Sequence, residues 1–264
     1  MNFKKVNHEI ILIEYKIEEN FIMHGLLCCG GKGTRLYPLT KVINKHLVPI
    51  GNRPMVYYGL EKMTEAGIKE VLIVTGIDHC GTLIEQCGDG KEWGLNLTYK
   101  VQTEAGGIAQ AISLAENFSN GDSLFVILGD NIFNMSVKNI ANNFSSGAKI
   151  FLKCVHDAKR FGVATCKERK STTDPFIVEK IVEKPEHPET NLAVIGIYIY
   201  DNTVFNKIRT LKASDRGELE VTDLNNLYIK ENKMTAEIMS DNDWWTDAGT
   251  FESLIKANKF IEEK

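Results

Sequence analysis

The 264-residue sequence predicts an α/β fold, with a mainly parallel sheet flanked by helices and a smaller strand-rich lobe. Over the first 150 residues, short apolar runs typical of buried strands alternate with patterns at helical spacing. Glycine follows each of these apolar runs closely, as is common where a strand turns into the next element. After about residue 150 the candidate strands follow one another more closely, which predicts the second lobe.

The first part of the chain contains the pattern of a parallel sheet. Apolar runs predict buried strands over 25–29, 71–74 and 124–128, and helical spacing predicts helices over 55–65 and 108–118. Strands that are apolar on both faces are typical of a parallel sheet covered by helices on its two sides. We therefore expect residues 23–150 to form the parallel, helix-covered part of the fold.

The second part, residues 151–264, is predicted to add strands and a final helix. Candidate strands cover 150–155, 162–166, 176–182 and 193–200, and the segments 206–212 and 224–231 look helical or mixed. The last helix is predicted to begin at Thr250 as its N-cap. Its apolar face is expected to be formed by Phe251, Leu254, Ile255 and Ile261.

Composition excludes several classes of protein. The 31 basic and 35 acidic residues give a net charge of −4, which argues against bulk nucleic-acid binding or a membrane-surface role. No apolar run approaches the ~20 residues that span a bilayer. The six cysteines fit neither a zinc ribbon nor a C-x-x-C pair, so we expect reduced thiols in a cytoplasmic protein. Residues 1–22 contain no glycine or proline and are predicted to be an N-terminal extension.

A glycine-rich loop follows the first predicted strand and contains Gly30, Gly31, Gly33 and Thr34. Glycines allow close approach of the backbone to an anion, whose oxygens can accept from its N–H groups. The spacing matches neither a Walker A loop nor a dinucleotide fingerprint. Taken alone, the loop is either a tight turn or an anion site.

Two cations close to this loop favour the anion site. Arg35 follows the glycines directly and Lys45 lies ten residues further on. Arginine offers a bidentate fork and lysine a mobile point charge, which together suit a polyphosphate. The alternative is that both side chains are ordinary solvated surface charges.

Two aspartates are candidate metal ligands. Asp130 stands at the carboxyl end of a predicted parallel strand, where α/β proteins place their ligands, and Asp247 lies 117 residues later. Mg²⁺ binds through one or two carboxylates together with phosphate oxygens and water. Either aspartate could instead cap a turn.

These motifs and several later ones, in this order, resemble the sugar-1-phosphate nucleotidyltransferase family. The resemblance is strongest to members that join dTTP to glucose 1-phosphate, and it covers essentially all of residues 23–262. The matching segments are 25–41, 45–49, 101–102, 107–111, 128–133, 161–164, 182–185, 193–198, 216–223 and 245–250. The family implies a Rossmann-like nucleotide-binding part over about 23–150 and a sugar-binding part over about 151–264.

The resemblance also implies a role for individual residues. Asp130 and Asp247 would hold Mg²⁺, while Arg35 and Lys45 would be catalytic. The remaining residues would line the two substrate sites: Gly30, Gly31, Gly33, Thr34, Gln102 and Gly107 for the nucleotide, and Gly162, Glu183, Lys184, Val194 and Tyr198 for the sugar phosphate.

The implied reaction converts dTTP and glucose 1-phosphate to dTDP-glucose and pyrophosphate, for deoxysugar or surface polysaccharide synthesis. It needs no general base, because a phosphate monoester is mostly dianionic at pH 7, its second pKa being about 6. We expect a cytoplasmic homo-oligomer with no nucleic-acid or membrane partner.

Three alternatives stay open from the sequence. The enzyme could use UTP or CTP, or a different sugar 1-phosphate. The triplet from Asp241 to Asp243 has the D-x-D form of a metal-dependent glycosyltransferase. The chain could also be a non-catalytic nucleotide-binding homologue.

Overall fold

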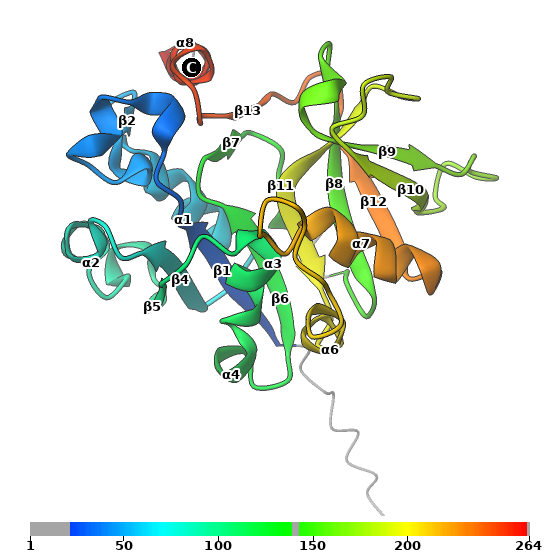
Figure 1. Cartoon of the computed structure of the whole chain (residues 1–264), viewed down its shortest axis with the longest axis horizontal. Helices are drawn as coiled ribbons and strands as arrows, with labels where there is room; N and C mark the ends of the chain where they lie inside the picture. The colour runs from blue at the N-terminus through cyan, green and yellow to red at the C-terminus, as the bar shows by residue number, and fades with distance from the viewer. Residues whose placement is uncertain (1–21, 139–142, 263–264) are drawn as a thin grey trace, which may run out of the picture.

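A nine-stranded sheet runs through the protein in the order β5-β4-β1-β6-β11-β8-β12-β10-β9 (Figure 1). The computed structural model describes residues 22–138 and 143–262, so residues 1–21 of the predicted extension lie outside the described residues. The sheet is continuous across residue 150, because β6 in the first part pairs with β11 in the second. The two predicted parts therefore share one sheet.

The first part of the sheet is parallel, as predicted. It is made of β1 (Met23–Cys29), β4 (Glu70–Gly76), β5 (Asn96–Gln102) and β6 (Ser123–Leu128). Their side chains alternate between two cores: Leu27 faces one cluster and Leu26 faces the other. Because both faces of β1, β4 and β6 are covered, these three strands are apolar runs. The edge strand β5 instead alternates between exposed and half-buried residues over most of its length.

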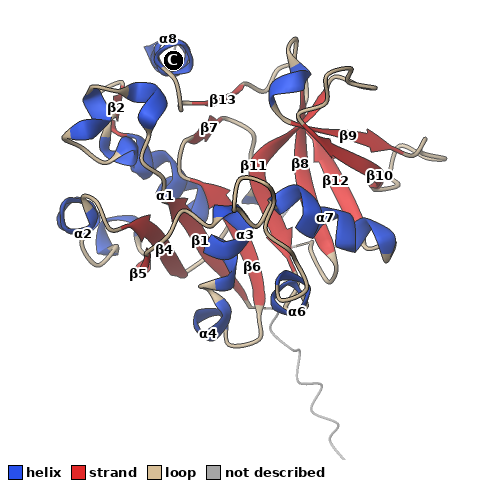
Figure 2. Ribbon diagram, in the orientation of Figure 1, coloured by secondary structure: helices blue, strands red, loops and turns tan. Residues whose placement is uncertain are grey.

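Helices cover the two faces of this parallel part. Helix α1 (Met55–Glu65) packs on the face of Leu27, where a Cβ on Gly59 would lie 2.7 Å from Leu27 Cδ1. On the opposite face lies α3 (Gly107–Ser113), followed by the short α4 (Glu116–Ser119), and Figure 2 shows α3 in front of the sheet. Helix α2 (Cys80–Cys87) connects β4 to β5.

The prediction of a mainly parallel sheet is wrong for the second part. Strand β11 (Leu192–Tyr200) is antiparallel to both β6 and β8 (Ala148–Cys154). Strand β12 (Met234–Ile238) is parallel to β8, whereas β10 (Phe176–Glu183) is antiparallel to both β12 and β9 (Gly162–Cys166). The whole sheet is therefore mixed, and a buried apolar run gives no sign of strand direction.

Two small ribbons stand above the carboxyl ends of the parallel strands. Strand β7 (Asn131–Phe133) pairs with β13 (Trp245–Asp247), and β2 (Pro49–Ile50) pairs with β3 (Arg53–Pro54). The final helix, α8 (Phe251–Glu262), follows β13 and contacts β2 (Figure 1). Short 3-10 turns cover 34–36, 39–41, 45–47, 91–93 and 158–160.

The helix predicted over 108–118 needs correction, and the two segments expected to be helical or mixed are resolved. The segment 108–118 is split into α3 and α4, because N–H groups near Leu114 bond three residues back and Ser113 Oγ donates to the Gln110 carbonyl. The segment 206–212 is helical only at its start, within α6 (Val204–Ile208). The segment 224–231 is helical up to Lys230, where α7 (Val221–Lys230) ends.

The face of α8 also differs from the prediction. Phe251 and Ile255 are 45% and 58% exposed, whereas Ala257 is fully buried. Leu254 and Ile261 do pack against the protein, in the cluster that contains Ile50 and Ala257. The face toward the protein is thus rotated from the expected one, and small residues occupy its centre.

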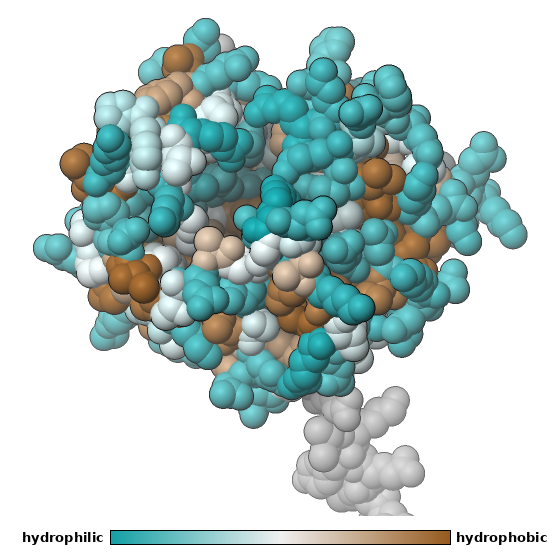
Figure 3. Space-filling model, in the orientation of Figure 1, coloured by the Kyte–Doolittle hydropathy of each residue, from teal (hydrophilic) through white to brown (hydrophobic). Residues whose placement is uncertain are grey.

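The face seen in the orientation of Figure 1 is ordinary for a globular protein. Figure 3 shows a mostly hydrophilic face with hydrophobic residues scattered singly or in small groups. Within the described residues, no helix is both long and apolar enough to cross a bilayer. The six cysteines are free thiols, as predicted.

Candidate active site

The ribbon of β7 and β13 brings Asp130 and Asp247 to neighbouring positions. Asp130 is separated from β6 by Gly129 and immediately precedes β7, whereas Asp247 is the last residue of β13 and pairs with Asn131 in the ladder. The N–H of Ala248 donates to the Asp130 carbonyl oxygen at 2.7 Å. Two carboxylates that are 117 residues apart in sequence therefore share one corner of the fold.

Asp130 is a largely buried carboxylate, its side chain 14% exposed, with two side-chain partners. Lys45 Nζ lies 2.7 Å from Oδ2, and the amide of Asn131 donates to Oδ1 at 2.9 Å. Burial by itself raises the pKa of Asp130, but Lys45 and the hydrogen bonds outweigh that effect and lower the pKa to about 2. Asp130 is therefore ionised at any physiological pH.

Asp247 is shifted in the opposite direction. Its pKa is raised, first by burial and then by the negative charge of Asp130, and Arg160 and Arg35 offset this only in part. The two carboxylates therefore repel each other across a partly desolvated corner. A divalent cation between them would remove this repulsion.

The donor set fits magnesium better than a metal that needs a complete protein cage. The described residues contain no group of three or more His, Cys, Asp or Glu side chains placed to hold a metal. Two carboxylates supply only part of an octahedral shell. Substrate phosphates and water would have to supply the remaining oxygens, which is the usual arrangement for Mg²⁺.

Asn131 holds this corner together. Its Oδ1 accepts from the backbone N–H of Gly196 at 3.0 Å and from Trp245 Nε1 at 2.7 Å, and its Nδ2 donates to Asp130. Gly196 lies in an irregularity of β11, where the register shifts between Val194 and Tyr198. A Cβ on Gly196 would lie 2.5 Å from Asn131 Nδ2, so glycine is needed for this approach.

The glycine loop places Arg35 beside the two carboxylates. Gly33 has φ of 60° and accepts a hydrogen bond from Thr40 Oγ1 at 2.7 Å, which fixes the turn. Arg35 is exposed, and a Cβ on Gly249 would lie 2.8 Å from its Nη2 and 3.4 Å from Asp130 Oδ2. The guanidinium and the carboxylate thus approach the same point above Gly249.

The loop is open on its outer side. Gly31 has φ of 90°, and no atom lies within 4 Å of the position its Cβ would take. Thr34 is also exposed, whereas Gly30 is half-buried against the side chain of Gln102. The loop can therefore receive an anion without rearrangement of its neighbours.

His46 supports the site from beneath. It is buried, its Nδ1 lies 2.9 Å from Asn44 Oδ1, and burial followed by the charge of Lys45 lowers its pKa to about 3. A Cβ on Gly129 would lie 2.7 Å from the His46 ring. His46 is therefore neutral at pH 7, packs in the interior and is too buried to act as a base.

Gln102 and Gly107 lie together at the carboxyl end of β5. Gln102 Nε2 donates to the Gly107 carbonyl oxygen at 3.1 Å and to Gln110 Oε1 at 2.6 Å. A Cβ on Gly30 would lie 2.9 Å from Gln102 Oε1. The predicted base-binding residues are thus next to the glycine loop.

The predicted sugar residues gather on β9, β10 and β11. Gly162 pairs with Glu183, whose Oε2 accepts from Thr222 Oγ1 at 2.7 Å. Lys184 has a left-handed backbone, with φ of 42°, and its Nζ lies 3.3 Å from Glu183 Oε1. Non-glycine residues in this strained conformation are common at ligand sites.

Tyr198 links the sugar residues to the aspartates. It is buried, and its pKa is raised by burial first and then by Glu183, Cys28 and Asp130. Val194 is half-buried at the start of the β11 irregularity. The structure therefore places Tyr198 within electrostatic range of both ends of the predicted site.

Sequence reasoning did not single out Asn131, Thr222 or Arg160. Asn131 belongs to a segment that matches the family, but its role depends on partners from two distant strands. Arg160 lies within electrostatic range of Asp247, and both line a cavity of about 440 Å³. No local pattern could have indicated either contact.

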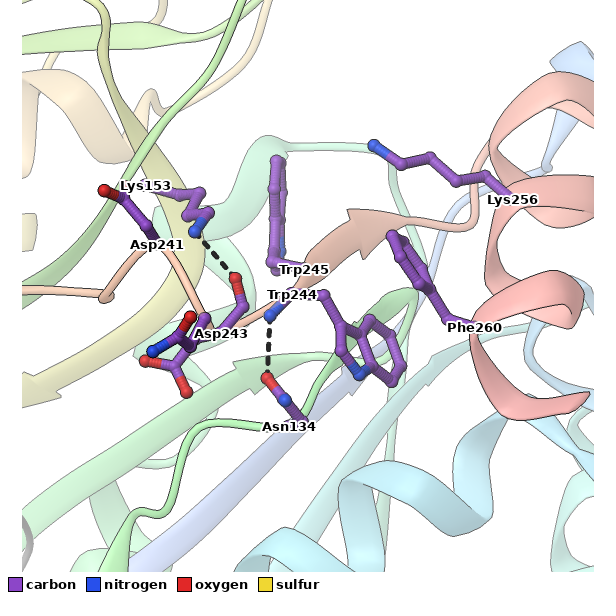
Figure 4. Close-up of a pocket in the computed structure, with 9 residues that line it drawn as sticks. Asn134, Lys153, Asp241, Asp243, Trp244, Trp245, Lys256 and Phe260 are labelled. Carbon is purple, nitrogen blue, oxygen red and sulfur yellow. Dashed lines mark hydrogen bonds between the residues drawn. The ribbon is translucent and has the colours of Figure 1, made fainter. Parts of the chain in front are cut away.

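The D-x-D triplet belongs to a different cavity, of about 500 Å³, shown in Figure 4. Asp241 and Asp243 line it together with Trp244 and Phe260, and no residue of the glycine loop does so. The Asp243 Oδ2 atom accepts from the N–H and hydroxyl of Ser240, so this carboxylate caps a local turn. The geometry does not favour a metal site there.

Comparison with known proteins identifies the family. The family described as "Nucleotidyl transferase" matches residues 24–264. The chain belongs to this family. This nucleotidyltransferase is 37% identical over 245 residues to a glucose-1-phosphate thymidylyltransferase of Neisseria meningitidis. The alignment covers 91% of this chain and 83% of that protein.

Solved structures agree with this assignment. The nucleotidyltransferase is similar to a crystal structure described as a glucose-1-phosphate thymidylyltransferase from Bacillus anthracis in complex with sucrose. That match has a TM-score of 0.84 and 46% identity, and covers 92% of this chain and 96% of the other. A crystal structure of a UDP-glucose pyrophosphorylase complexed with UDP-glucose matches with a TM-score of 0.80 and 24% identity, covering 92% of this chain and 100% of the other. This match supports the fold alone.

Proposed function

We propose that this nucleotidyltransferase makes dTDP-glucose and pyrophosphate from dTTP and glucose 1-phosphate, with Mg²⁺ as cofactor. The relatives' activity supports the choice of substrates. One observation carries the proposed chemistry: Asp130, Asp247 and Arg35 converge beside the open glycine loop. This arrangement suits the transfer of a charged phosphoryl group. The barrier to such a transfer comes from repulsion between the anionic reactants and from the need to align them.

The residues act by positioning and by charge. The N–H groups of the glycine loop and the guanidinium of Arg35 would bind triphosphate oxygens, while Lys45 adds a second positive charge beside Asp130. When bound between Asp130 and Asp247, Mg²⁺ would neutralise the negative charge on those oxygens. No side chain has to remove a proton from the sugar phosphate, which is mostly dianionic at pH 7.

The bond changes are those of a direct displacement. A phosphate oxygen of glucose 1-phosphate attacks the α-phosphorus of dTTP, a new P–O bond forms, and the bond to the β-phosphate oxygen breaks. Pyrophosphate leaves with the bonding electrons. Lys184 would hold the sugar phosphate in line for this attack, and Glu183 would accept hydrogen bonds from sugar hydroxyls.

The neighbours of Glu183 prepare it for that role. Thr222 donates to one carboxylate oxygen and Lys184 lies beside the other, so the side chain is held from both sides. Gly162, Val194 and Tyr198 would form the wall of the sugar pocket. A cytoplasmic location, a homo-oligomeric state and a role in deoxysugar or surface polysaccharide synthesis remain predictions from the sequence.

The direct test is pyrophosphate release with purified full-length protein. dTTP, UTP, dCTP and CTP are each offered with glucose 1-phosphate, then dTTP is offered with other sugar 1-phosphates, with and without EDTA. We expect the fastest release with dTTP and glucose 1-phosphate and none with EDTA. Preference for another triphosphate or another sugar 1-phosphate would overturn the proposed substrate. Full activity in EDTA would overturn the proposed need for Mg²⁺.

An exposed aspartate provides a matched control. Asp241→Asn changes the same functional group as Asp130→Asn, but in the D-x-D triplet outside the proposed site. We expect Asp241→Asn to keep wild-type turnover. Loss of activity in Asp241→Asn, together with sugar transfer to an acceptor, would favour the glycosyltransferase alternative.

A further inference from the structure

We propose that Gln110 is a positioning residue for base selection. It fixes the side-chain amide of Gln102 so that Gln102 presents a hydrogen-bond acceptor to the base. This orientation selects pyrimidines with an N–H at position 3, such as thymine and uracil, against cytosine. The inference rests on the proposed function, because it assumes that the base lies beside Gln102.

A backbone carbonyl determines the orientation of both amides. The Gly107 carbonyl oxygen can only accept, so the Gln102 atom 3.1 Å from it must be the nitrogen, Nε2. That nitrogen also lies 2.6 Å from the amide of Gln110, whose contacting atom must then be the oxygen. Neither amide can flip without placing two like groups against each other.

The backbone on either side of the Gly107 carbonyl is held by hydrogen bonds to Leu219. The Gly106 carbonyl accepts from the N–H of Leu219 at 2.8 Å, and the N–H of Ala109 donates to the Leu219 carbonyl at 3.2 Å. A Cβ on Gly106 would lie 2.4 Å from the Gln110 side chain, so this glycine makes room for the amide. The acceptor for Gln102 is therefore in position before any nucleotide binds.

The remaining atom of Gln102 faces the glycine loop. The position of a Cβ on Gly30 is 2.9 Å from Gln102 Oε1, whereas both hydrogen bonds of the Gln102 side chain use Nε2. Among residues 22–138 and 143–262, no group donates to this Oε1. An acceptor without a partner is thus directed toward the proposed nucleotide site.

This acceptor distinguishes bases by the hydrogen at N3. Thymine and uracil have an N3–H group that donates to Oε1. Cytosine has a lone pair at N3, so two acceptors would face each other and the partly desolvated Oε1 would be left without a donor. A site built to accept a hydrogen bond strongly disfavours an analogue that lacks the donor.

The test compares selectivity among variants of Gln110. We measure kcat/KM for dTTP and for dCTP with glucose 1-phosphate and Mg²⁺, and take their ratio. Gln110→Leu removes the acceptor for Gln102, and Gln110→Met is a second apolar variant should the first fold poorly. Gln110→Glu is the matched control, because a carboxylate can still accept from Nε2.

We expect wild type to prefer dTTP by on the order of 100-fold or more. Gln110→Leu and Gln110→Met should reduce the ratio roughly tenfold, because one of the two hydrogen bonds holding the amide is lost. Gln110→Glu should keep the wild-type ratio even if its added charge lowers both rates. An unchanged ratio in the apolar variants, or an equal loss in Gln110→Glu, would overturn the inference.

Calorimetric binding of dTTP and dCTP without sugar phosphate separates this inference from the proposed function. If wild type binds dTTP selectively but does not turn over, the proposed function fails while the role of Gln110 is still tested by the binding ratio. If wild type binds both triphosphates equally, the inference is overturned. If wild type is selective and active but Gln110→Leu is equally selective, the inference alone fails.

Discussion

Asp130 and Asp247 provide two variants that should both abolish activity but change stability in opposite directions. A pKa of about 2 for Asp130, against an ordinary value of 3.8, corresponds to about 2 kcal/mol of stabilisation at neutral pH. Asp130→Asn loses this and leaves Lys45, whose side chain is 12% exposed, without its carboxylate. We expect the free energy of unfolding to fall by about 2–3 kcal/mol.

Asp247→Asn should have the opposite effect on stability. The pKa of Asp247 is raised by burial and by the charge of Asp130, so its ionised form destabilises the folded protein. Asparagine removes that charge with little change of shape. We expect the free energy of unfolding to rise by about 0.5–1 kcal/mol, which is a typical gain when a strained functional group is replaced.

The two effects also differ in their dependence on pH. The contribution of Asp130 is present above the ordinary carboxyl pKa of about 4 and is lost as pH falls through its folded value of about 2. The penalty from Asp247 is complete above its raised folded pKa and vanishes below the ordinary value. The wild type and Asp247→Asn should therefore become equally stable in acid.

Urea denaturation from pH 3 to pH 8 measures the free energy of unfolding of each variant. Pyrophosphate release at pH 7.5 measures its activity. The exposed Asp241→Asn variant is the control and should match wild type in stability and activity. Opposite roles for the two carboxylates in stability would be refuted if Asp247→Asn were as unstable as Asp130→Asn. Retention of substantial activity by either site variant would refute the shared metal role.

Further predictions concern the surroundings of the site and the final helix. Gly249→Ala should lower kcat/KM roughly 10–100-fold in the pyrophosphate assay, because the new methyl group displaces Arg35; unchanged kinetics would show that Arg35 is not held there. Asn131→Ala loses three side-chain hydrogen bonds, two of them buried, and should lower the unfolding free energy by about 3 kcal/mol in urea. A loss under about 1 kcal/mol would contradict its central role. In thermal unfolding, the stability of Ile255→Ser should stay within about 0.5 kcal/mol of wild type, whereas Ala257→Leu should lower stability by about 1–3 kcal/mol through overpacking. A larger loss in Ile255→Ser than in Ala257→Leu would show that the α8 face predicted from sequence is the buried one.

Strands with a continuous apolar run, such as β1, β4 and β6, could be predicted from sequence. Strands β5 and β12 have no such run and are not among the predicted strands. The expected strand over 162–166 coincides with β9, and the others differ from β1, β6, β8 and β10 by one or two residues at their ends. Helix α1 begins and ends where predicted, because proline precedes it and Ala-Gly follows it. Local patterns suffice where burial alone determines the element.

Strand direction and the face of α8 could not be predicted in this way. An apolar run such as β11 is compatible with a parallel or an antiparallel neighbour, and the choice depends on the path of the chain between strands. In α8 the large residues Phe251 and Ile255 suggested the buried face. The close approach to β2 instead places Ala257 at the contact and leaves those side chains exposed.

The site shows the same division between local and long-range information. Asp130, Arg35 and the glycine loop lie near one another in the fold because each follows a recognisable strand or turn. The positions of Asn131 and Gln110 become informative only through their partners, which include Trp245 from a distant strand. Such contacts depend on side-chain geometry and have no local sequence signal.

The central claim is that Asp130 and Asp247 hold one divalent cation together. A crystal grown with Mn²⁺ and a non-hydrolysable dTTP analogue tests it directly through the anomalous signal of the metal. We predict a single peak within coordination distance of both carboxylates, about 2.0–2.2 Å, and in contact with phosphate oxygens of the analogue. A nucleotide bound at the glycine loop with no peak between the two aspartates, or with the metal at another place, would contradict the account.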